Sequence, residues 1–279
     1  MKTEKKCKEK KLLAVIYVLC TLIIVVKILD IYGSTDSPPE YPDYEMLNLE
    51  DALNIEKTYQ GHVDEETLEI LFYQTGLGQE ALEDIIKECY DSQEFLEVLE
   101  KYQKQLFFGT YNNSVVSLED GDVMVSLSQR LCFYPHGHAA IVTDGEAGEI
   151  IEAKSYIAGS CIGDTEKWSK ISSFVILRVK EEVAEKYKNP APRAAQYAKN
   201  NLNGLEYSLF KDIRFQQDET PEYTQCAHLV WFAYYKCGLD IDENRGIIIK
   251  PRDFLASDVF EVVQVFGINP KTIMEMRDE

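Results

Sequence analysis

The sequence predicts an α+β fold for its main domain, because β-rich segments come first and two helical segments follow. The strand candidates are short, rich in β-branched residues and bounded by Gly, Asp or Ser; they are 120–127, 138–144, 148–154 and 172–179. The helix candidates are 181–202, which is interrupted at Pro190 and Pro192, and 224–238, which ends at Gly238 in the position usual for a helix C-terminus. We expect this domain to cover residues 109–265.

The first 32 residues differ from the rest of the chain. Six lysines and two glutamates in MKTEKKCKEKK precede a predominantly apolar run over residues 12–31, in which Lys27 can snorkel. The run is long enough for one bilayer crossing, and the lysines place its N-terminal side in the cytoplasm. We therefore expect a cytoplasmic tail and a single-pass anchor in the cell membrane over 1–32, with the main domain extracellular. The alternative is a cleaved signal peptide, although no small-x-small cleavage site precedes Tyr32.

Three further segments are distinguished by composition. Residues 33–48 contain three prolines and several acidic residues, which predicts an extended linker. Residues 49–108 form a helical segment, with apolar residues at helical spacing in 64–76, 79–90 and 92–108. At the C-terminal end we expect a loop over 250–267, and residues 266–279 are assigned to a polar tail.

Charge and cysteine content exclude some functions. The formal net charge of −19 argues against electrostatic binding of nucleic acid. The seven cysteines form no C-x-x-C pair and match no zinc spacing, so we expect neither a metal site nor a cofactor. A disulfide between Cys132 and Cys161 is one possibility, but at least one cysteine of the extracellular part would then remain unpaired within the chain.

The segment EYTQCAHLVWFAYYKCG holds two cysteines in different positions of one predicted helix. Cys237 is at the C-terminal end, where the helix dipole disfavours a thiolate. Cys226 is in the first turn, where the positive end lowers the pKa of a thiol. The polar stretch before it is expected to leave the helix start exposed, so Cys226 is the candidate nucleophile. His228 points to another side of the helix and is interpreted as a packing residue.

A nucleophilic thiol needs a base from elsewhere in the fold, and that base needs an orienting partner. His138 begins a strand directly after Gly137, where a neighbour can approach closely. If 144–148 is a hairpin loop, Thr143 pairs with Glu149 and Ala140 with Glu152, which puts Glu152 on the face of His138. A one-residue shift would point Glu152 away. His136 follows Pro135 and is interpreted as a rim residue on the substrate side.

Three stretches together resemble a known family: GHAAIVTDGEAGEIIEA, GLEYSLF and YTQCAHLVWFAYYKCGLDID. They are similar to the YiiX-like, circularly permuted branch of the NlpC-type papain-like cysteine hydrolases, over about residues 115–260. Glu119 and Asp120 stand where that family usually has a proline before its first strand. The resemblance implies an antiparallel sheet or half-barrel packed on the cysteine helix. It also implies that Cys226 is the nucleophile, His138 the base and acid, and Glu152 the orienting residue, with Tyr207 lining the site beside the oxyanion pocket.

The function expected from this resemblance is a cysteine peptidase or amidase. Its substrate would be a peptide, with the stem peptides of a peptidoglycan-like wall as the first candidate, and backbone N–H groups at the helix start would hold the oxyanion. Two alternatives remain. One is a lipid-directed acyltransferase or amidase that uses the same residues, and the other is a surface module without enzymatic activity in which Cys226 is a core residue.

Overall fold

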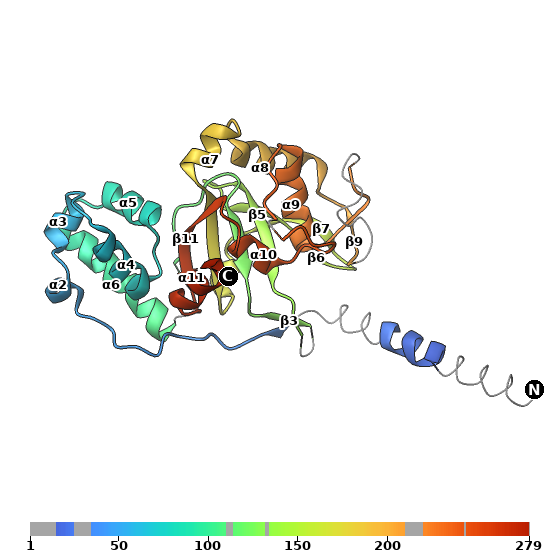
Figure 1. Cartoon of the computed structure of the whole chain (residues 1–279), viewed down its shortest axis with the longest axis horizontal. Coiled ribbons are helices and arrows are strands. Elements are labelled where there is room, and N and C mark those ends of the chain that lie inside the picture. Colours follow the sequence, from blue (N-terminus) through green and yellow to red (C-terminus); the bar gives the residue numbers. More distant parts are fainter. Residues whose placement is uncertain are drawn as a thin grey trace, which may run out of the picture.

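The computed structural model describes residues 15–24, 35–109, 114–131, 134–209, 220–242 and 244–278. Within them the main body is an α+β domain with a six-stranded antiparallel sheet in the order β11-β8-β2-β5-β6-β7, which confirms the predicted class (Figure 1). The strands of this sheet are β2 (Val123–Ser126), β5 (His138–Asp144), β6 (Glu149–Ser155), β7 (Gly159–Asp164), β8 (Phe174–Val179) and β11 (Phe260–Phe266).

The central strands are buried on both faces. All four residues of β2 are buried; Val123 and Val125 belong to the apolar cluster that includes α8 (Pro190–Asn201) and α9 (Cys226–Lys236), whereas Met124 belongs to a second cluster on the other face. Burial on two sides explains why these strands are almost continuously apolar rather than alternating.

The second face is covered by a helical unit, drawn in blue to green beside β11 in Figure 1. Leu71, Phe95 and Leu99 of this unit share an apolar cluster with Phe174 and Phe266 of the sheet. The unit spans residues 49–108 and contains α2 (Leu49–Ala52), α3 (Ile55–Tyr59), α4 (Glu65–Thr75), α5 (Gln79–Glu88) and α6 (Ser92–Phe108). The last three correspond to the predicted helices, while the two short ones were not expected.

Acidic N-caps mark the start of α4 and α6. Asp64 accepts a hydrogen bond from the N–H of Thr67 at 2.8 Å, and Asp91 accepts from Glu94 at 2.9 Å. Gly76, with φ of 73°, ends α4 in the left-handed conformation that glycine adopts readily.

The C-terminal region corrects two predictions. The segment expected to be a loop contains β11, whose Phe260, Val263 and Val265 are buried and which pairs with β8 along the sheet edge. The predicted polar tail instead contains helix α11 (Pro270–Asp278), which buries Pro270 and Ile273. Both elements form because their apolar side chains complete the cores on either side of the sheet.

The remaining described elements are short. Segment 35–48 carries only a two-residue strand, and its Glu40 N–H donates to the carbonyl of Gly267 at 2.9 Å. These elements are β1 (Thr35–Asp36), β3 (Gln129–Leu131), β4 (Tyr134–Pro135), the 3-10 helix η1 (Trp168–Lys170), α7 (Glu181–Lys186), β9 (Glu206–Tyr207), β10 (Tyr223–Thr224) and α10 (Pro251–Leu255).

The structure describes only part of the predicted membrane anchor. Residues 15–24 are helical, while 12–14 and 25–31 lie outside the described residues. Among the residues that the structure describes, no helix combines the length and the apolar character needed to cross a bilayer. The anchor over residues 12–31 therefore stays a prediction.

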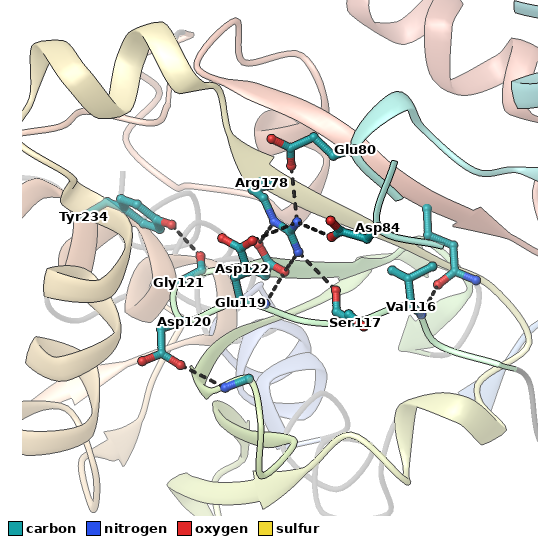
Figure 2. A network of polar contacts seen from close by, with 12 residues as sticks. Glu80, Asp84, Val116, Ser117, Glu119, Asp120, Gly121, Asp122, Arg178 and Tyr234 are labelled. Carbon is teal, nitrogen blue, oxygen red and sulfur yellow. Dashed lines mark hydrogen bonds and ion pairs between the residues drawn. The ribbon is translucent and has the colours of Figure 1, made fainter. Parts of the chain in front are cut away.

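Arg178 on β8 is a buried cation where the helical unit meets the sheet. Its guanidinium forms a bidentate pair with Asp122, with Nε 2.9 Å from Oδ1 and Nη2 2.8 Å from Oδ2. Nη1 lies 3.3 Å from Oε2 of Glu80 on α5, and Nη2 donates to the carbonyl of Ser117 at 3.1 Å (Figure 2). Arg178 thereby connects α5, the segment before β2 and the centre of the sheet.

Replacing Arg178 by Met should destabilise the fold strongly. The carboxylate of Asp122, whose side chain is 1% exposed, would lose its partner, and an uncompensated buried charge costs about 3–5 kcal/mol. Urea unfolding measures the loss. Lys170→Met is the control, because its ion pair with Glu166 is exposed and is worth less than about 1 kcal/mol. Equal effects of the two substitutions would contradict the role given to Arg178.

Stability should also depend on the protonation of Glu261, which pairs with Arg178 across β11 and β8. Burial, followed by the neighbouring carboxylate of Glu80, raises the pKa of Glu261 from 4.5 to about 7. The folded protein therefore keeps a proton that the unfolded chain releases near pH 4.5, so this contribution to stability is complete at low pH and is lost as the pH rises through 7. The charge of Arg178 lowers the pKa of Glu261, whereas the charge of Glu182 raises it.

We expect Glu261→Gln to stabilise the protein at pH 8 and to flatten its pH dependence between pH 5 and 8. The free energy of unfolding, measured at both pH values for the variant and the parent, checks this. An unchanged difference between the two pH values would show that another group is responsible.

Candidate functional site

Cys226 begins helix α9, and Gln225 is its N-cap. The Oε1 atom of Gln225 accepts a hydrogen bond from the N–H of Ala227 at 2.9 Å and lies 3.5 Å from the thiol of Cys226. Its Nε2 donates to the carbonyl of Ile249 at 2.8 Å. These bonds satisfy one of the first N–H groups of the helix and fix the backbone that carries the thiol.

His138 is the first residue of β5 and follows Gly137, whose φ is 69°. A Cβ at Gly137 would lie 2.8 Å from the carbonyl oxygen of Ser126 and 3.2 Å from Cβ of Pro251, so the close approach expected there is present. The His138 ring stacks on Trp168, with 5.7 Å between centroids and 19° between planes. Backbone and ring packing together hold the imidazole in one orientation.

Glu152 is the partner of His138. Ala140 pairs with Glu152 across β5 and β6, as predicted, and Nε2 of His138 lies 2.6 Å from Oε2 of Glu152. The second expected pair is wrong: a register shift after Val142 pairs Asp144 with Glu149, instead of Thr143. Because this irregularity falls beyond Ala140, it leaves Glu152 on the face of His138.

The thiol of Cys226 acts electrostatically on the His138 ring, which is hydrogen-bonded to Glu152, so the three side chains form one chain of contacts. Burial by itself lowers the pKa of His138, but the contacts with Cys226 and Glu152 outweigh it and raise that pKa above 6.5. Since Nε2 of His138 is engaged by Glu152, Nδ1 is the ring nitrogen left to exchange a proton with the thiol. An imidazole placed between a carboxylate and a thiol can accept the proton of the thiol.

Glu152 is held in its ionised form by two cationic neighbours. Burial raises the pKa of this carboxyl group, but the hydrogen bonds and charges of His138 and Lys154 outweigh burial and lower it below its ordinary value. Nζ of Lys154 lies 3.0 Å from Oε1 of Glu152. A negative Glu152 stabilises the imidazolium form of His138 and fixes the orientation of its ring.

The structure corrects the expected exposure of the helix start. Cys226 is 5% exposed, Thr224 and Gln225 before it are also buried, and the Gln225 side chain contacts its thiol. The expectation of an exposed Cys226 is therefore wrong.

Tyr207 and His136 lie beside this chain of contacts. Tyr207 on β9 pairs with Thr224 on β10, and Thr224 precedes Cys226 by two residues. The ring of Tyr207 packs edge-on against Tyr156, with 5.2 Å between centroids. His136 donates its N–H to the carbonyl of Gln129 at 3.2 Å. Burial lowers the pKa of His136; a hydrogen bond with the backbone of Gly137 opposes this effect, and the charge of His138 adds to it.

His228 and Cys237 pack as predicted. His228 is 5% exposed and lies 3.0 Å from the hydroxyl of Thr224 through Nδ1. Burial lowers its pKa from 6.5 to about 4, so this imidazole is neutral. Cys237 ends helix α9, and burial raises the pKa of its thiol. Neither residue has the environment of a reactive group.

Two neighbours of the site were not predicted. Lys154 follows Glu152 by two residues on the same strand. Because alternate residues of a strand share a face, this spacing could have placed Lys154 beside Glu152. Trp168 lies in η1, far from His138 in the sequence, and no local pattern points to it. Cys161 pairs with Glu152 across β6 and β7 and carries a free thiol, while Cys132 lies outside the described residues.

The described residues contain no group of three or more His, Cys, Asp or Glu side chains arranged to hold a metal ion. Comparisons with protein-family models, curated proteins and solved structures find no match for this chain.

Replacing Glu152 by Gln should slow the alkylation of Cys226. The neutral amide no longer stabilises the imidazolium form, so the pKa of His138 falls and the thiolate–imidazolium pair is less populated near neutral pH. We expect the rate with iodoacetamide at pH 6–7 to fall by about tenfold, measured by peptide mass mapping at Cys226. Glu149→Gln, on the same strand but paired with Lys199, is the control. Equal rates in the parent and Glu152→Gln would show that the carboxylate does not act on the thiol.

Proposed function

We propose that the protein is a cysteine hydrolase of the permuted papain-like type, with Cys226 as nucleophile, His138 as base and acid, and Glu152 as orienting residue. The observation that carries the proposal is that these three side chains, from α9, β5 and β6, meet: His138 is hydrogen-bonded to Glu152 and interacts with the thiol of Cys226. Thiol, imidazole and carboxylate in this order are the parts that nucleophilic thiol catalysis requires.

The proposed reaction begins with attack of the Cys226 sulfur on a carbonyl carbon. The proton held by His138 passes to the leaving amine, which releases the first product and leaves an acyl-enzyme. His138 then removes a proton from water, which attacks the acyl carbon and regenerates the thiol. Throughout these steps Glu152 keeps the ring in position and balances its positive charge.

The developing oxyanion needs donors at the start of α9. The N–H of Ala227 is held by Gln225 in this conformation, so the N–H of Cys226 is the proposed donor. A shift of the Gln225 side chain on substrate binding would release the Ala227 N–H as a second donor and open the thiol. Tyr207 and His136 would line the approach of the substrate.

The substrate class proposed is a peptide or amide of a peptidoglycan-like wall. A single-pass anchor over residues 12–31, with the domain extracellular, would bring the site to such a substrate. This placement depends on the composition of the N-terminal segment. The acidic charge of the chain does not favour a polyanionic substrate.

A lipid-directed acyltransferase or amidase is the second candidate. Tyr156 and Ile157, on the turn between β6 and β7, are 37% and 75% exposed, and Tyr156 packs on Tyr207. An exposed apolar side chain that packs on Tyr207 would suit an acyl chain. The low exposure of Cys226 instead favours the third interpretation, in which this cysteine is a core residue of a surface module without enzymatic activity.

Cys226→Ala should abolish turnover of muropeptides, measured by chromatography of the released fragments. Loss of the nucleophile removes the covalent route, and we expect a fall of roughly 10³-fold or more. Cys237→Ala is the matched control, because it removes a half-buried thiol from the other end of the same helix and should leave the rate unchanged.

Unchanged turnover in Cys226→Ala would refute the hydrolase proposal. Release of fatty acid from phospholipid, with no action on muropeptides, would decide for the lipid-directed alternative. No turnover of either substrate, with Cys226 alkylated no faster than an ordinary thiol, would favour the surface module.

A further inference from the structure

Lys154 forms an ion pair with the carboxylate oxygen of Glu152 that does not contact His138. Nζ of Lys154 lies 3.0 Å from Oε1, whereas Nε2 of His138 lies 2.6 Å from Oε2. The two oxygens of one buried carboxylate are thus divided between two donors. A glutamate held at one oxygen can still rotate about its terminal bond, but one held at both cannot rotate without losing a charged partner.

The surroundings make this ion pair stronger than a surface pair. The side chain of Glu152 is 6% exposed and that of Lys154 is 30% exposed, so the carboxylate is largely shielded from water while the ammonium group keeps part of its hydration. Gly163 on β7 lies against the carboxylate, since a Cβ there would be 3.1 Å from Oε1 of Glu152. A side chain at that position would crowd the ion pair.

We propose that Lys154 is a positioning residue of the site, which fixes the Glu152 carboxylate so that Oε2 faces His138 and the imidazole is presented to Cys226. Lys154 acts through Glu152 and contacts no reacting atom. The effect on turnover rests on the hydrolase function proposed above, whereas the effect on the Glu152 carboxylate does not.

Four titratable groups face this arrangement from the elements around it. They are His138 on β5, Cys226 on α9, Cys161 on β7 and His136 before β5. Lys154 interacts with Glu152 first and with Cys161 second. Removing the Lys154 charge therefore acts mainly on Glu152, whose pKa must rise when a cation is lost and burial remains.

The test compares Lys154→Met with Lys154→Arg and with the control Lys199→Met. Lys199 forms an ion pair at 2.7 Å with Glu149, which lies on the same strand but does not contact His138. An NMR titration of the Glu152 carboxyl carbon should shift to higher pH by about half a unit or more in Lys154→Met. The acid limb of the alkylation rate of Cys226 should move in the same direction.

For turnover, kcat/KM in Lys154→Met should fall by about five- to tenfold, mainly through kcat, and Lys154→Arg should restore it. A Glu152 titration that is the same in Lys154→Met as in the parent, or that shifts equally in Lys199→Met, would overturn the proposal. Lys154→Gln replaces the Met variant if that protein does not fold. If no form of the protein hydrolyses a substrate, the hydrolase proposal fails while the NMR titration still decides the role of Lys154.

Discussion

The central sheet is buried on both faces, and this constraint governs the rest of the structure. Helices α8 and α9 cover one face, and the helical unit over residues 49–108 covers the other. Any polar side chain on these strands must then find a partner inside the protein, because burial without one costs several kcal/mol. Arg178 meets this requirement with Asp122, and His138 meets it with Glu152.

The two polar arrangements lie at opposite ends of β5. Near its end, Gly145 donates to Asp120, which precedes the Asp122 that binds Arg178, and this region joins the sheet to the helical unit. At its start, about 20 Å away by the rise of an extended strand, His138 meets Glu152 and Cys226.

Local sequence predicted the elements whose apolar pattern is complete within one segment. The strands over 138–144 and 148–154 and the helix that begins at Cys226 are of this kind. The sequence over 250–267 predicts a loop, whereas residues 260–266 form β11. This strand depends on pairing with β8, which is far away in the sequence. The acidic polar tail was likewise found to be helical, since Pro270 and Ile273 pack into cores made by distant residues.

By itself, the sequence determined the α+β class and the pairing of Ala140 with Glu152. It also favoured Cys226 over Cys237 as the candidate nucleophile. These follow from periodicity, from hairpin length and from the helix dipole, which are all local properties. Only the tertiary structure decided that Cys226 is covered, that Trp168 stacks on His138 and that Lys154 shares the carboxylate of Glu152. Burial, ring stacking and charge sharing depend on residues from separate segments meeting in space, and no local pattern records which segments meet.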